Sequence, residues 1–112
     1  MAFTTSTAVR VEQGNKQLQG AFSEMWFVTA TIDPNSVAAG AEDTGTLTVP
    51  GVALGDMVVG FSAGVNQTVD ADFNAFVSAA NTVTVRLSNL NGAAALDLAT
   101  STWKVLVARP LW

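Results

Sequence analysis

Strict alternation of apolar and polar residues marks two segments of the chain, residues 82–88 and 102–108. Alternate positions along each segment form two sets, which we call phases. One phase holds the β-branched, leucine and aromatic residues, and the other phase starts with polar residues. The apolar phase consists of Val83, Val85, Leu87, Trp103, Val105 and Val107. A period of two with such residues predicts a β-strand with one buried face. In the second segment the polar phase ends in Leu106 and Ala108, so we expect this end of its outer face to be covered.

Four further segments are expected to form strands because they are rich in apolar and β-branched residues, and residues 10–12 are a short additional candidate. In the longest, residues 22–32, one of the two alternating sets of positions holds Phe22, Trp26, Val28, Ala30 and Ile32, with Glu24 as the exception. Residues 57–62 are apolar in both phases, which is typical of a strand that is covered on both sides. The remaining candidates are residues 10–12, 46–49 and 73–78.

Turn-forming residues separate these segments at intervals of about ten residues, as in all-β domains. They include Asp33-Pro34-Asn35, Pro50-Gly51, Gly55-Asp56, Asn81 and Asn91-Gly92. Only residues 93–99, which are rich in alanine, favour a helical turn. The sequence therefore predicts an all-β fold, a small antiparallel β-sandwich or flattened barrel of about seven strands.

The first forty residues have a different character from the rest of the chain. We expect residues 1–40 to form an N-terminal arm plus one strand, packing on the domain or on a partner, and residues 41–112 to form the β-sandwich domain. Trp26 and Phe27 are adjacent, so they face opposite sides of a strand and only one of them can enter the core. The apolar residues without an obvious cover, which we expect at an interface, are Phe3, Phe22, Trp26, Phe27, Leu111 and Trp112.

The composition of the 112 residues excludes several kinds of chemistry. Without Cys there is no disulfide, thiolate nucleophile or iron–sulfur ligand, and without His there is no imidazole base. Lys16 and Lys104 do not lie beside a serine that they could activate. The chain has only five Lys and Arg and a net charge of −4, which is too little positive charge for a surface that binds nucleic acid. We therefore expect no enzyme activity, no metal or cofactor and no nucleic-acid partner.

The N-terminus carries no basic stretch followed by an apolar one, so no secretory signal is expected. The most apolar run, residues 21–32, is shorter than the roughly 20 residues that a membrane-spanning helix needs. We expect a protein that is made and folded in a cytosol and has no membrane partner.

The carboxylates are candidates for chemistry, and each also has a structural interpretation. Asp70 and Asp72 could hold Ca²⁺ or act as acid and base, but the third oxygen-rich position and the downstream Glu of a calcium loop are missing. We expect a solvated turn there, and a solvated loop at Glu42 and Asp43. Asp56 opens a strand, where a carboxylate usually accepts hydrogen bonds from turn amides.

The three tryptophans could form a stacking platform for a carbohydrate. Trp103 lies in the inward phase of its segment, so we expect it in the core. Trp112 follows the last predicted strand, and we expect it to pack on its own domain or on a neighbouring subunit.

Four motifs within residues 47–109 resemble, in the same order, those of a family of small tailed-phage virion proteins. They are TVPGVALGDMV (48–58), FVSAANTVTVRLSN (76–89), ALDLA (95–99) and TWKVLVAR (102–109). The resemblance does not include the first forty residues. It implies a β-domain of the kind found in capsid decoration proteins, head fibres and tail parts.

The function that the resemblance favours is that of a capsid cement or decoration protein. Such a protein binds the outer surface of the major capsid protein lattice and stabilises the head, and the negative charge suits the outside of a shell. The expected partners are the major capsid protein and further copies of the chain, a homotrimer rather than a dimer. The expected location is the capsid surface of the virion, after synthesis in the host cytoplasm. A tail or head–tail connector component and a carbohydrate-binding module are the alternatives.

Overall fold

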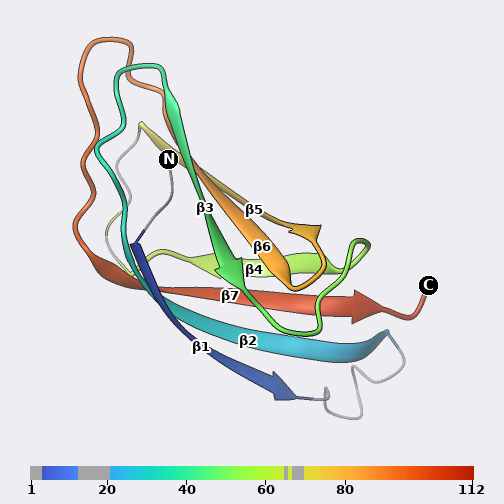
Figure 1. Ribbon diagram of the computed structural model, residues 1–112. Coiled ribbons are helices and arrows are strands. Elements are labelled where there is room, and N and C mark those ends of the chain that lie inside the picture. The colour runs from blue at the N-terminus through green and yellow to red at the C-terminus, as the bar shows by residue number, and fades with distance from the viewer. Residues whose placement is uncertain (1–3, 13–20, 65, 67–69) are drawn as a thin grey trace.

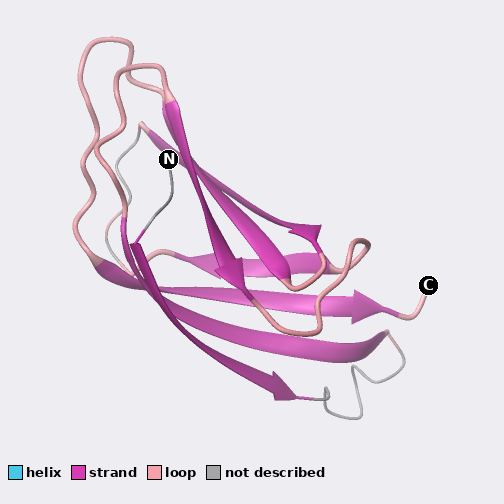
Figure 2. Ribbon diagram, viewed as in Figure 1, coloured by secondary structure: helices cyan, strands magenta, loops and turns pink. Residues whose placement is uncertain are grey.

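The computed structural model describes residues 4–12, 21–64, 66 and 70–112, and it confirms the all-β prediction. Every regular element in this part of the chain is a strand, with loops between them (Figure 2). The strands are β1 (Thr4–Glu12), β2 (Phe22–Asp33), β3 (Glu42–Thr48), β4 (Met57–Ser62), β5 (Ala71–Ala79), β6 (Thr82–Asn89) and β7 (Ser101–Pro110). Among these described residues there is no helix long and apolar enough to cross a membrane.

The strands form two antiparallel sheets that face each other (Figure 1). One sheet has the order β1-β2-β7-β4 and the other has the order β3-β6-β5. The sheets approach each other along both sides, where β1 lies near β3 and β4 lies near β5. They do not join into a closed barrel, so of the two predicted forms the small β-sandwich is the one that is compatible with the structure.

The hydrophobic strand of the first forty residues packs on the domain. β2 lies between β1 and β7, and its pairing with β7 runs from Phe22 opposite Pro110 to Ile32 opposite Ser101. β1 pairs with β2 along its whole length, so the strand expected at residues 10–12 begins six residues earlier, at Thr4. Much of the predicted arm is therefore an edge strand of the four-stranded sheet.

The predicted apolar phases supply the core. All six residues of the two alternating segments are buried, but they face one another from different sheets, from β6 and from β7. Trp103 is at the centre, fully buried, with the rings of Phe61 and Phe73 packed edge-on against its indole. The inward phase of β2 faces the same core through Trp26, Val28, Ala30 and Ile32.

Residues 93–99, whose alanines favour a helical turn, do not form one. Leu96 instead forms an isolated bridge with Val37, through backbone hydrogen bonds of 2.8 and 2.9 Å. The buried Asn89 side chain donates a hydrogen bond to the Ala94 carbonyl at 2.8 Å and another to the Val37 carbonyl at 3.1 Å. These contacts hold the two long loops side by side (Figure 1), and they outweigh the helix propensity of the alanines.

Two further expectations need correction. The strand expected at residues 46–49 begins at Glu42, because residues 42–44 also pair with β6. β4 is not covered on both faces, since the sandwich has only two layers and the outer side of this strand is partly open to solvent. Met57 and Val59 are exposed as a result.

Candidate docking surface

The outer face of the four-stranded sheet carries apolar side chains in rows that cross β2, β7 and β4. Because side chains alternate along a strand, the neighbours of the core residues point outward. The first row pairs Leu106 with Phe27 on one side and with Gly60 on the other. The second row pairs Ala108 with Met25 and with Met57. The alternation that buries the core thus also places apolar residues on the outer face, where Met57 is exposed but Ala108 and Met25 are buried, as expected for this end of β7.

The same face becomes polar towards its other end. The next row holds Lys104 between Thr29 and Ser62, and beyond it Thr31 pairs with Thr102. Lys104 and Thr102 are exposed. The outer face is therefore divided along the strands into a polar half and an apolar half, and the apolar half lies towards the C-terminus.

The chain continues the apolar half beyond the last strand. Phe22 pairs with Pro110, and the ring of Phe22 lies 5.8 Å from that of Trp112, while the Leu111 amide donates to the Ala21 carbonyl at 2.9 Å. Trp112 is nevertheless 78 % exposed. We call this set the apolar surface: Phe22, Phe27, Met57, Leu106, Leu111 and Trp112.

A shallow groove of about 230 Å³ crosses the border between the two halves. Phe27, Leu106 and Gly60 line its apolar part, and Lys104 and Ser62 line its polar part. Gly60 has no side chain, which leaves space beside Leu106. The groove fits an apolar group that is flanked by a hydrogen-bond acceptor or a negative charge within reach of Lys104.

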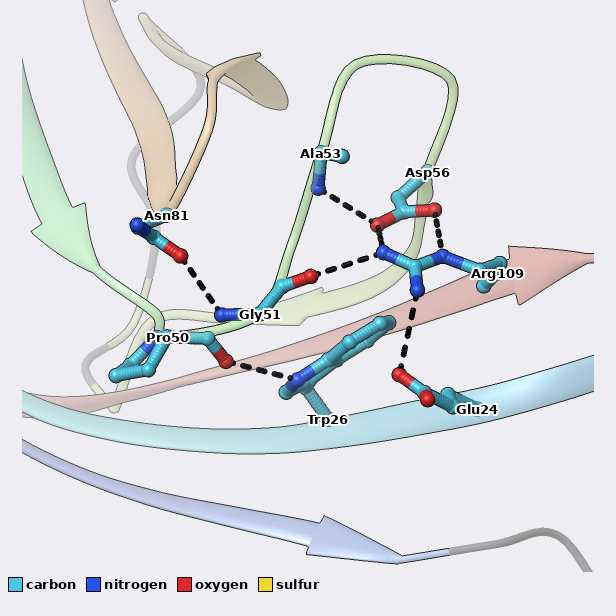
Figure 3. Close-up of polar contacts among 8 residues, drawn as sticks. All are labelled: Glu24, Trp26, Pro50, Gly51, Ala53, Asp56, Asn81 and Arg109. Atoms are coloured by element: carbon cyan, nitrogen blue, oxygen red, sulfur yellow. Dashed lines mark hydrogen bonds and ion pairs between the residues drawn. The ribbon is translucent and has the colours of Figure 1, made fainter.

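Arg109 forms a polar junction on the inner side of the same end of the sheet (Figure 3). Its Nε and one terminal nitrogen both donate to the Asp56 carboxylate at 2.9 Å, and that terminal nitrogen also donates to the Gly51 carbonyl at 2.9 Å. Its other terminal nitrogen lies 3.5 Å from Glu24. The guanidinium carbon lies 5.1 Å from the centre of the Trp26 ring, a cation–π contact.

The junction fixes residues 49–56 against the sheet. The Trp26 indole donates to the Pro50 carbonyl at 3.2 Å, and the Gly51 amide donates to the Asn81 side chain at 2.8 Å. Gly51 has a φ of +99°, and a Cβ there would lie 3.4 Å from the Trp26 ring nitrogen. Glycine therefore allows this loop to approach the indole in a conformation that other residues rarely adopt.

The charges of the junction stabilise one another. Burial by itself raises the pKa of the Asp56 carboxyl, but the hydrogen bonds from Arg109 and the Ala53 amide, with the positive charge of Arg109, outweigh burial and lower that pKa below its ordinary value of 3.8. The hydrogen bond to Asp56 likewise raises the pKa of Arg109. The expectation that Asp56 accepts a hydrogen bond from a turn amide is confirmed by the 2.8 Å bond from Ala53.

Replacing Asp56 with asparagine is expected to reduce stability at neutral pH but much less in acid. A carboxylate whose folded-state pKa is lowered stabilises the fold above its unfolded pKa of 3.8 and loses this contribution as the pH falls through the lowered value. Urea denaturation of both proteins at several pH values from about 7 to about 2 measures the difference. An Asp56→Asn deficit that stays constant across this range would contradict the assignment of the stabilising charge to Asp56.

The structure distributes the six predicted interface residues over different environments. Phe3 lies outside the described residues. Trp26 lies inside the core, whereas the adjacent Phe27 is 41 % exposed, so the expected division between these two residues is confirmed. The other three, Phe22, Leu111 and Trp112, meet at the C-terminal end, where Phe22 is half-buried.

The remaining candidate carboxylates, Asp70, Asp72, Glu42 and Asp43, do not form a cluster among the described residues. Asp70 accepts a hydrogen bond from the Asn91 side chain at 3.2 Å, and Asp72 is exposed on β5. The described residues contain no group of three or more acidic side chains that could hold a metal ion. The expectation of a solvated loop at the acidic pair is wrong, because both residues belong to β3: Asp43 is buried and accepts a hydrogen bond from Asn35 at 3.3 Å.

The tryptophans do not form a shared platform. Trp26 and Trp103 are buried in the core, and Trp112 is exposed at the chain end. The expectation of Trp103 in the core is confirmed. Trp112 was expected to pack on its own domain or on a neighbouring subunit, and its contact with Phe22 is a contact with its own domain.

Sequence reasoning missed the Arg109 junction and the role of Met57 in the apolar surface. A signal for the junction was present, because Glu24 interrupts an otherwise apolar phase and a charge in such a position needs a partner. The signal for the apolar surface was the pair Leu106 and Ala108, which break the polar phase of β7.

Comparison of the chain with protein-family models, with curated proteins and with solved structures found no match to any of them. The surfaces of this chain and the motifs in its sequence are therefore the evidence for its function.

Proposed function

We propose that this chain is a structural protein of a tailed-phage virion, and specifically a capsid cement or decoration protein that binds the outer surface of the major capsid protein lattice. The observation that carries the proposal is the apolar surface. Phe27 and Met57 are each 41 % exposed on a regular sheet, and Leu111 and Trp112 extend the surface at the chain end. Contiguous exposed apolar patches of this kind mark sites of protein–protein contact. The four sequence motifs that resemble those of phage virion proteins are the reason for proposing a capsid protein as the partner.

A sheet face of this kind suits a cementing role. It can lie across the seam between two capsomers and contact both, so that opening the seam requires loss of contact area. Stable attachment requires about 1,200–2,000 Å² of total buried surface. Many equivalent copies on one shell would add their contributions.

The proposal includes association of the chain with itself, as a homotrimer rather than a dimer. Capsid lattices present three-fold and quasi-three-fold sites, so a trimer can repeat the same contacts at each site. The exposed tail at Leu111 and Trp112 is the part of the apolar surface that we assign to this contact, because it projects from the end of the sheet.

Replacing Phe27 with serine is expected to weaken attachment to purified capsids by about 10- to 100-fold, because burial of one such side chain contributes about 1.5–3 kcal/mol. The matched control is Phe76→Ser, since Phe76 lies on the outer face of the other sheet and is also half-exposed. Occupancy of the shells, measured by quantitative electrophoresis of washed particles, gives the affinities. Equal losses for the two variants, or no loss for Phe27→Ser, would contradict the assignment of the apolar surface.

The alternatives predict different outcomes. A cement protein approaches the copy number of the major capsid protein in virions, whereas a tail or connector component is present in far fewer copies. A carbohydrate-binding module would bind glycans on an array. A low copy number or specific glycan binding would replace the cement proposal.

A further inference from the structure

Strands β4 and β5 lie near each other along one side of the sandwich but do not pair. These strands follow one another in sequence but lie in different sheets, and each is the outermost strand of its sheet. Among the described strands, β4 pairs with β7 and β5 pairs with β6, so each keeps one edge without a neighbour. A cleft of about 260 Å³ lies between them, lined by residues 58–61 and 73–75.

The cleft combines two chemical features. The rings of Phe61 and Phe73, with centroids 5.4 Å apart, are only partly buried, although both pack on the fully buried Trp103. The backbone groups on the free edge of each strand are the second feature, because an edge strand presents N–H and C=O groups that pair with no neighbouring strand. An extended peptide satisfies both features at once, with backbone hydrogen bonds to an edge and alternate side chains against the rings.

The free edge of β5 suits an added strand better than that of β4. β4 has a register shift between Val58 and Gly60, and such bulges interrupt edge pairing. β5 pairs regularly with β6 from Ala71 to Val77, and its own shift comes only after Val77. A strand of about seven residues therefore has an uninterrupted edge on β5.

The charge around the cleft indicates the chemistry of the partner. β4 contains no charged residue, and the only one in β5 is Asp72, which is exposed on the outer side of the strand. Asp70 precedes it, and the whole chain has a net charge of −4. A second copy of β5 would bring another Asp72 to the same outer side of the sheet, whereas an added strand with a basic residue on that side would pair with Asp72.

We propose that the β5 edge and the cleft beside it bind an extended segment of another protein, with alternating β-branched apolar residues on one side and a basic residue on the other. The bound segment adds a fourth strand to the β3-β6-β5 sheet. Its apolar side chains cover Phe61 and Phe73, and its basic side chain lies beside Asp72. The cleft adjoins the groove beside Leu106, because Gly60 and Phe61 line both, but it contains none of the six residues of the apolar surface and the inference does not depend on the proposed function.

The test uses the full chain labelled with ¹⁵N and the capped peptide Thr-Val-Lys-Val-Thr-Val-Thr. We expect amide chemical-shift changes and slower hydrogen exchange at Ala71–Val77 with millimolar peptide. A peptide with proline in place of the central valine should bind much more weakly, because proline removes a backbone donor. No response up to the solubility limit, or responses confined to other strands, overturns the proposal.

Charge reversal tests the specificity. Asp72→Lys should weaken binding of the lysine peptide by about threefold to tenfold and strengthen binding of a peptide with glutamate in place of lysine. Asp97→Lys is the matched control, because Asp97 is exposed in the loop before β7, outside β4 and β5. If both variants respond alike, the effect is one of net charge and the assignment of Asp72 is wrong. If sedimentation shows that the chain alone associates through a protected β5 edge, a second copy is the occupant and the proposal is overturned.

Discussion

Replacing Trp103 with alanine is expected to lower the free energy of unfolding by about 3–5 kcal/mol. The indole is fully buried between the sheets and contacts Phe61 and Phe73 at centroid distances of 5.4 and 5.2 Å. Its ring nitrogen donates to the Ser101 hydroxyl at 2.8 Å. Alanine would leave a cavity bounded by both sheets, and the paired backbones prevent the sheets from closing over it. Urea denaturation followed by circular dichroism measures the change.

Trp112→Ala is the matched control for this prediction. Trp112 is the same residue type but is 78 % exposed, with one aromatic contact to Phe22. We expect its replacement to change the free energy of unfolding by less than about 1 kcal/mol. If Trp103→Ala costs as little as Trp112→Ala, the inward orientation of Trp103 is wrong.

Replacing Arg109 with methionine is expected to lower the free energy of unfolding by about 1–3 kcal/mol. Methionine retains an apolar stem of similar length, but it leaves the Asp56 carboxylate without the donors of Arg109, and that side chain is only 4 % exposed. The loss is smaller than for a fully buried pair, because the Arg109 side chain is 33 % exposed and solvent screens it. Denaturant titration at neutral pH measures it.

Two comparisons separate the junction from a general effect of charge. Arg86→Met removes an arginine whose ion pair with Glu42 is longer, at 3.7 Å, and more exposed, so we expect a loss below about 1 kcal/mol. The double variant with Asp56→Asn and Arg109→Met should lose less stability than the sum of the two single variants. Arg109→Met leaves the Asp56 carboxylate without its partner, and Asp56→Asn removes that carboxylate. Additive losses would show that Arg109 acts through its packing on Trp26 rather than through Asp56.

The strands that alternate strictly were predictable from the sequence. In β6 and β7 the side-chain period of two follows from backbone geometry alone, so the buried positions from Val83 to Val107 could be assigned without knowing their partners. The same periodicity separated Trp26 from Phe27. The local sequence predicted the structure less well where contacts with a distant segment decided the backbone conformation. β3 extends to Glu42 because β6 offers a partner there, and residues 93–99 form no helical turn because Val37 and Asn89 bind their backbone.

The candidate surface was only partly visible in the sequence. Leu106 and Ala108 indicated a covered outer face, and Phe27 was expected to need a cover. That these residues share one face with Met57 depends on β7 pairing with both β2 and β4. The open cleft between β4 and β5 likewise follows from the assignment of these consecutive strands to different sheets.

The sequence by itself determined which faces of the strands are apolar, because alternation along a strand is a local property of the extended backbone. Tertiary structure alone decided which strands lie side by side. The contact of Arg109 with Asp56 joins residues 53 positions apart. Such pairings depend on which strands become neighbours in a sheet, since the free energy of many distant contacts together, rather than the propensity of any one segment, selects among the possible strand orders.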